Sequence, residues 1–222
     1  MHCQRGPAAD DVPIELWTAE SLAGPLSRTA PSLNVKVQGL LNAAKWIEEE
    51  YGAAALQAVL RECSVGVRER CSFAIPLSWH PVEELVELLT VAERKLGQED
   101  GKLAEAIGAA GAHSNMKGVL VRFARYLVGS EYLTRRIAGM WRQFNDDGEM
   151  RVISDTDANV VLEMVGIKQP HWLFCCTLTG WCREVSLAMG ARQPIVRHVQ
   201  CRTRGDERCV YDIRRLTGLG VA

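Results

Sequence analysis

The 222-residue sequence has no long apolar run, no excess of charge of one sign and no secretory leader. Without a stretch of about eighteen apolar residues, we expect no transmembrane span. The 27 acidic and 26 basic residues nearly cancel, which disfavours a dedicated nucleic-acid binder because such proteins present a basic face. Residues 1–11 are polar and lack the apolar core of a signal peptide, so we expect a cytoplasmic protein.

Hydrolase motifs are also missing. The sequence contains no Gly-x-Ser-x-Gly turn, and no acid stands at signature spacing from His113 and Ser114. Cysteine, in contrast, is plentiful at eight residues. In a reducing compartment we expect these cysteines to be thiols, metal ligands or catalytic groups rather than disulfides. Since 47% of the residues are hydrophobic, a core can form without cross-links.

Periodicity predicts an α+β fold in which an N-terminal helical bundle packs on an antiparallel sheet of C-terminal hairpins. Residues 1–32 are expected to be a flexible arm, residues 33–216 one domain, and residues 217–222 a tail. Small residues at 108–112 predict a helix that another backbone approaches closely. Helices are predicted over residues 35–51, 53–60, 81–96, 102–127, 131–144 and 172–189. Strands are predicted over residues 150–153, 160–165, 194–202 and 208–213.

A cysteine–histidine cluster is predicted near the C-terminus. His198, Cys201 and Cys209 follow the spacing His-x2-Cys-x7-Cys, and a three-residue turn at 204–206 would bring the two cysteines opposite each other. In a regular strand His198 and Cys201 point to opposite faces, so convergence requires a bulge or a strand end. Cys175 or Cys176 at the start of the preceding helix, or Cys182 on the same face, could supply a fourth ligand. Spacing alone also allows plain packing of thiols or a cross-strand disulfide.

Three segments of this region resemble the 4-vinyl reductase domain family: 174–181 (FCCTLTGW), 196–201 (VRHVQC) and 205–209 (GDERC). In the phenol- and xylene-sensing members of that family, four side chains at these places bind zinc. The resemblance implies a structural zinc ion on Cys175, His198, Cys201 and Cys209. The sequence departs from the family at His198, where the sensing members have glutamate; histidine is also an ordinary zinc ligand.

A narrower resemblance extends over nearly the whole chain from about residue 35. Segments 38–41 (QGLL), 79–81 (WHP) and 141–146 (WRQFND) are similar to an uncharacterised paralogous family of myxobacteria. The wider superfamily contains haem-nitric-oxide sensor domains and core subunits of the TRAPP vesicle-tethering complex. It implies an α+β ligand-binding architecture and, for several members, a homodimer.

Aromatic side chains near the helix-to-sheet junction are candidates for an apolar pocket, although an ordinary core would use the same residue types. We therefore expect a non-enzymatic regulatory domain that binds an apolar small molecule and signals through a homodimer or a partner protein. The alternative is a TRAPP-like interaction scaffold without a ligand; an enzyme of tetrapyrrole chemistry rests on a family name alone. A cavity of about 300 Å³ would favour the first, and a filled interior with an exposed apolar patch the second. The candidate pocket residues are Phe123, Tyr126, Trp141, Phe144, Trp172 and Trp181.

Overall fold

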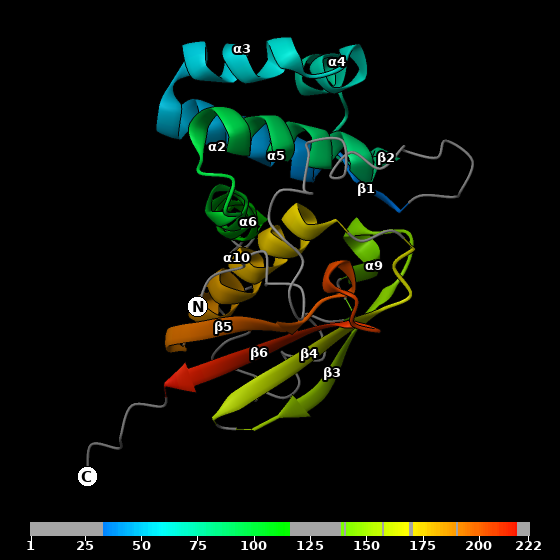
Figure 1. Cartoon of the computed structure of the whole chain (residues 1–222), viewed down its shortest axis with the longest axis vertical. Helices are drawn as coiled ribbons and strands as arrows, with labels where there is room; N and C mark the ends of the chain where they lie inside the picture. The colour runs from blue at the N-terminus through cyan, green and yellow to red at the C-terminus, as the bar shows by residue number, and fades with distance from the viewer. Residues whose placement is uncertain are drawn as a thin grey trace, which may run out of the picture.

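The computed structural model describes residues 33–115, 139, 141–156, 158–168, 171–189 and 191–216. The expected arm, the expected tail and the pattern over 116–138 lie outside these ranges. Figure 1 shows helices stacked on one face of a sheet, with α3 and α4 farthest from it and α6 and α10 next to it. This arrangement confirms the predicted α+β class. In chain order the elements are β1 (Asn34–Lys36), α2 (Gln38–Tyr51), α3 (Ala53–Glu62), α4 (Val65–Phe73), β2 (Trp79–Pro81), α5 (Val82–Leu96), α6 (Lys102–Asn115), α9 (Trp141–Phe144), β3 (Glu149–Asp155), β4 (Asn159–Val165), α10 (Trp172–Ala188), β5 (Arg192–Gln200), η2 (Arg202–Arg204) and β6 (Cys209–Leu216).

The helical layer follows from apolar spacing and from charges at the helix ends. In α2, Leu40, Ala43, Ala44 and Ile47 recur three or four residues apart and are all buried. Helix α5 begins after Pro81 with acidic residues in its first turn and basic residues in its last, which suits the helix dipole at both ends. Among the described residues, no helix combines the length and apolarity needed to cross a membrane.

The sheet has the strand order β3-β4-β6-β5, and all neighbouring strands are antiparallel. Its two hairpins are those that the sequence predicted. Register places one apolar row on the face toward α10, which crosses the sheet (Figure 1). The residues of this row are Met150, Val152, Val160, Leu162, Met164, Val196, Tyr211 and Ile213. This face forms the floor of the core on which the candidate site is built.

Helices α6 and α10 cross at the distance of backbone contact. A Cβ atom added to Gly108 would lie 1.9 Å from the carbonyl oxygen of Thr177, and one added to Gly180 would lie 1.8 Å from that of Glu105. Arg183 and Glu105 close the crossing with an ion pair at 2.9 Å. Only glycine permits this approach, so the prediction of a close backbone contact at Gly108 is confirmed.

The imidazole of His171 caps α10 and makes its stability depend on pH. Its Nδ1 accepts a hydrogen bond from the amide of Leu173 at 3.2 Å, and burial lowers the pKa of His171 from 6.5 to about 4. The unfolded chain therefore binds more protons than the folded chain between these values, so stability from this group is lost as pH falls from 6.5 toward 4.

We expect His171→Asn to reduce this pH dependence, because the asparagine oxygen accepts the same bond without titrating. Urea unfolding of both proteins at about pH 7 and about pH 5, with the same chelator present, measures the difference between their slopes. Equal loss of stability in both proteins would contradict the assignment to His171.

Candidate functional site

Four side chains from three elements converge beside the first turn of α10. Cys175 lies on α10, His198 on β5, Cys201 just after β5 and Cys209 at the start of β6. One potential ligand atom from each lies within 4.8 Å of every other, which is close enough to share a metal ion. The three cysteines are buried and His198 is partly buried. The donor set combines three sulfurs with one imidazole, a combination that suits transition metals rather than hard cations.

A β-bulge allows His198 and Cys201 to converge. The pairing register shifts between His198, which is opposite Tyr211, and Gln200, which is opposite Val210. The extra residue, Val199, is the departure from a regular strand that the ligand hypothesis required. The connection to β6 is longer than the predicted three-residue turn. It contains the 3-10 helix η2 and a left-handed Gly205 at φ 93°, which brings the chain back to Cys209.

Neighbouring groups orient these four side chains. The Tyr211 ring stacks on the His198 ring, with centroids 4.3 Å apart and planes 3° apart, and its hydroxyl donates to the Cys175 carbonyl at 3.3 Å. The amide of Arg202 donates to Cys209 Sγ at 3.5 Å. His198 Nε2 is buried and has no hydrogen-bond partner. A ring so fixed, with a nitrogen left unbonded, is available to a metal.

Within the cluster the pKa of one thiol is lowered and the pKa values of the other two are raised. Hydrogen-bond contacts with Cys175 and Cys209 lower the pKa of Cys201. The contact with Cys201, the contact with Cys209 and burial raise the pKa of Cys175 well above its ordinary value. Contact with Cys175 lowers the pKa of Cys209, but Cys201 and burial outweigh this effect and raise it. Metal ligation requires deprotonated thiols, so a bound cation would favour the thiolate form of these cysteines.

The alternative fourth ligands lie outside this cluster. Cys182 is buried on α10, where burial raises its pKa to about 12. Cys176 is disulfide-bonded, which departs from the expectation of thiols and metal ligands. The residue that resemblance selected, Cys175, is thus the cysteine of α10 that joins the other three.

An apolar cavity of about 140 Å³ borders α10 at residues that do not belong to the cluster. It is bounded by the β1–α2 junction, α5, α6, α9, β3 and α10. Phe174, which lines it, directly precedes the candidate ligand Cys175. The lining residues are Val35, Lys36, Gln38, Gly39, Asn42, Leu85, Ile107, Gly108, Gly111, Trp141, Phe144, Asn145, Met150, Phe174, Thr177, Leu178 and Trp181.

The structure brings three of the six predicted pocket residues together. Trp141, Phe144 and Trp181 line the cavity, and Trp141 meets Phe174 edge-on at 6.3 Å between ring centroids. Trp172, at the start of α10, is not part of the lining. Phe123 and Tyr126 lie outside the described residues.

Sequence reasoning missed the polar part of the lining. Gln38 Nε2 donates to Asn42 Oδ1 at 2.8 Å, and both side chains lie on the first turns of α2. The segment around Gln38 had signalled a family resemblance, but no spacing rule connects it to residues of α10. Its helical spacing with Asn42 is the one signal that could have placed two amides on the same face.

Solved structures share the fold of this chain. An H-NOX protein from S. oneidensis in the Fe(II)NO ligation state has a TM-score of 0.62 at 12% identity, over 82% of this chain and 99% of that one. Fe(II) unliganded H-NOX from K. algicida gives 0.60 at 8% identity, over 84% and 100%. A structure titled for heme distortion in the H-NOX family gives 0.62 at 13%, over 84% and 98%. No family model matches the sequence, and no curated protein matches it either.

These neighbours correct the cofactor expected from sequence. Their titles name heme or Fe(II), and none names zinc, so the expectation of zinc as the cofactor is wrong on this comparison. Haem itself does not fit the described cavity. About 140 Å³ is below the size of ordinary ligand sites, and no His, Cys or Tyr is among the described lining residues to serve as axial ligand. The chain thus shares the H-NOX fold, and its described part contains an apolar cavity of about 140 Å³ and a separate Cys3His cluster.

Proposed function

We propose that this chain is a non-catalytic regulatory domain that binds a compact apolar molecule in the cavity beside α10. The observation that carries this proposal is the cavity itself, which lies among four aromatic rings and between helices from both halves of the sequence. Most of its wall is apolar, while Gln38 and Asn42 provide a small polar region that can orient a ligand. H-NOX proteins of this fold have been solved in Fe(II) unliganded and Fe(II)NO ligation states, which supports ligand binding as the role of this domain.

The cavity size restricts the ligand. At about 140 Å³ it is smaller than the roughly 300 Å³ expected for a typical small-molecule site. Engineered apolar cavities of about 150 Å³ bind benzene or xenon. We therefore propose a ligand no larger than about one aromatic ring.

A metal ion held by Cys175, His198, Cys201 and Cys209 is the second part of the proposal. Four protein ligands leave no open coordination position, so the ion would be structural rather than catalytic. It would fasten the β5–β6 connection to α10, the helix that also lines the cavity. The donor atoms do not identify the metal, which elemental analysis must determine.

Native mass spectrometry with elemental analysis of the purified chain tests both parts. We expect one transition-metal ion per chain, and quenching or enhancement of tryptophan fluorescence on titration with benzene or toluene, because Trp141 and Trp181 line the cavity. Gly111→Leu should abolish the fluorescence response by filling the cavity, while Gly111→Ala, whose Cβ has open space, should retain it. A wild-type chain without metal and without any response to these probes would refute the proposal.

An interaction scaffold remains a second candidate because one observation favours it. The segment that joins α4 to β2 exposes several large apolar side chains, as a docking surface would. Binding of benzene by the wild-type chain but not by Gly111→Leu would favour the regulatory domain. A chain that binds a partner protein but shows no fluorescence response to any of the small probes would favour the scaffold.

A further inference from the structure

A short apolar segment projects from the end of α4. Here we call residues 73–79 the apolar loop. Its alternate residues Phe73, Ile75, Leu77 and Trp79 have exposed fractions of 88%, 72%, 71% and 43%. Single exposed apolar residues are common, but four large ones within seven residues concentrate apolar surface at one loop. Neither the proposed cavity nor the metal cluster uses these four side chains.

Backbone hydrogen bonds hold this loop against the start of α2. The amides of Val37 and Gln38 donate to the carbonyls of Ser78 at 3.0 Å and Pro76 at 2.9 Å. Lys36 Nζ donates to the carbonyl of Leu77 at 2.7 Å and lies 3.6 Å from the centre of the Trp79 ring. The loop therefore presents its apolar side chains from a fixed backbone, which lowers the entropy lost when a partner binds.

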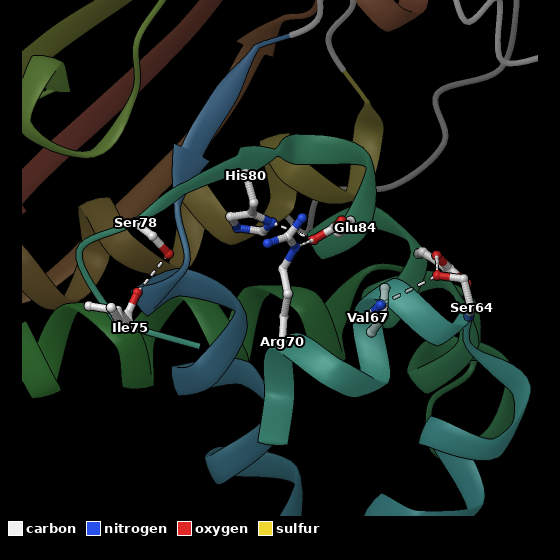
Figure 2. A network of polar contacts seen from close by, with 8 residues as sticks. Ser64, Val67, Arg70, Ile75, Ser78, His80 and Glu84 are labelled. Carbon is white, nitrogen blue, oxygen red and sulfur yellow. Dashed lines mark hydrogen bonds and ion pairs between the residues drawn. The ribbon is translucent and has the colours of Figure 1, made fainter. Parts of the chain in front are cut away.

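A charged network pins the two ends of the loop together. Arg70, three residues before the loop, and His80, immediately after it, both reach the same carboxylate oxygen of Glu84 on α5 (Figure 2). His80 Nδ1 lies 3.0 Å from Glu84 Oε2, and His80 is almost completely buried. Ser78 adds a turn within the loop by donating from its amide and hydroxyl to the Ile75 carbonyl, at 2.9 and 2.8 Å. These contacts fix both ends of the loop.

We propose that the apolar loop is the contact surface through which two copies of this chain dimerise. From their exposed fractions, the four side chains present roughly 500 Å² of apolar surface. Two copies facing each other would bury about 1,000 Å², the lower bound for a specific interface. A second copy offers the same apolar patch, so a two-fold contact would match apolar surface with apolar surface on both sides.

The position of the loop gives the dimer a connection to the cavity. Lys36 and Gln38 line the cavity and also hold the loop through their hydrogen bonds to Leu77 and Pro76. A ligand that shifts the β1–α2 junction would therefore shift the dimer contact. This regulatory role rests on the proposed function, but the existence of the dimer does not.

Sedimentation equilibrium of the full chain over a wide concentration range, with and without chelator, tests the surface. We expect a wild-type dimer in both conditions, and a dissociation constant raised about a hundredfold or more in the double variant Phe73→Ser/Leu77→Ser. Both side chains are exposed, so the fold should be retained and circular dichroism should be unchanged. Ile153→Ser on β3, where the exposed fraction is 51%, is the matched control and should leave the dimer intact.

Two results would overturn the proposal. One is a dimer that the double variant and the Ile153→Ser control weaken equally. The other is a wild-type chain that remains monomeric. If such a chain dimerised only after deletion of residues 1–32, the loop would bind that segment rather than a second copy. Because oligomeric state is measured without metal or probe, its failure is distinct from failure of the cavity or the cluster.

Discussion

Gly108→Ala is expected to lower the free energy of unfolding by about 4 kcal/mol or more, the range in which single substitutions become exceptional. The added methyl carbon would lie 1.9 Å from the carbonyl oxygen of Thr177, and that oxygen belongs to the backbone of α10. A flexible side chain could move aside, but here one helix must separate from the other. Both helices also line the cavity next to this crossing, so their separation should abolish the cavity as well.

Gly111→Ala is the matched control for this prediction. It lies one turn farther along α6, and the nearest atom to its added Cβ is Asn42 Nδ2 at 3.9 Å. With space available, alanine should be neutral or stabilise the helix by up to about 1 kcal/mol. Thermal and urea unfolding of both variants measure the contrast. A Gly108→Ala protein as stable as Gly111→Ala would show that the helices do not cross at this distance.

Cys209→Ser is expected to eliminate metal binding and lower stability by about 4 kcal/mol, the contribution of a ligand present at about a thousand times its dissociation constant. The loss should appear as a lower Tm and as zero metal by elemental analysis. It arises because the serine hydroxyl does not replace a thiolate and the buried His198 Nε2 would again have no partner.

The same substitution at Cys182 supplies the comparison. Cys182 is buried on α10 like Cys175 but does not belong to the four-residue group, so Cys182→Ser has the cost of a buried hydroxyl without loss of a ligand. A strong chelator should bring the wild-type Tm down to that of Cys209→Ser and leave Cys209→Ser unaffected. Wild-type stability that chelation does not change, in a protein without metal, would rule out the metal site.

Local patterns were sufficient for most of the regular elements. The apolar spacing of α2 and α5, the β-favouring residues of β3 and β4, and the turn residues between those strands are short-range signals that the structure confirms. Helix α4 was missed because its sequence, Val65–Phe73, has only one buried residue and no clear apolar face. Strands β1 and β2 were missed because each has three residues and is defined by pairing with the other.

The site was harder to predict because its parts meet only in three dimensions. The His-x2-Cys spacing indicated that a bulge was needed, and the register shift after His198 supplies it. The choice of Cys175 came from resemblance, since spacing cannot distinguish it from Cys176. The cavity wall contributed by Lys36, Gln38 and Asn42 depends on how α2 packs against α6 and α10, which no local pattern encodes. The size of the cavity depends on the same packing.

Phe174 and Cys175 are consecutive residues that face two different sites. Neighbouring peptide units on one helix cannot shift independently, so a change of tilt or rotation in α10 is felt at both places at once. Coupling between two binding sites is reciprocal. If a ligand in the cavity increases the affinity of the cluster for metal by some factor, bound metal must increase the affinity of the cavity for that ligand by the same factor. The concentration of cavity ligand needed to occupy this domain would then depend on how much metal the cell supplies.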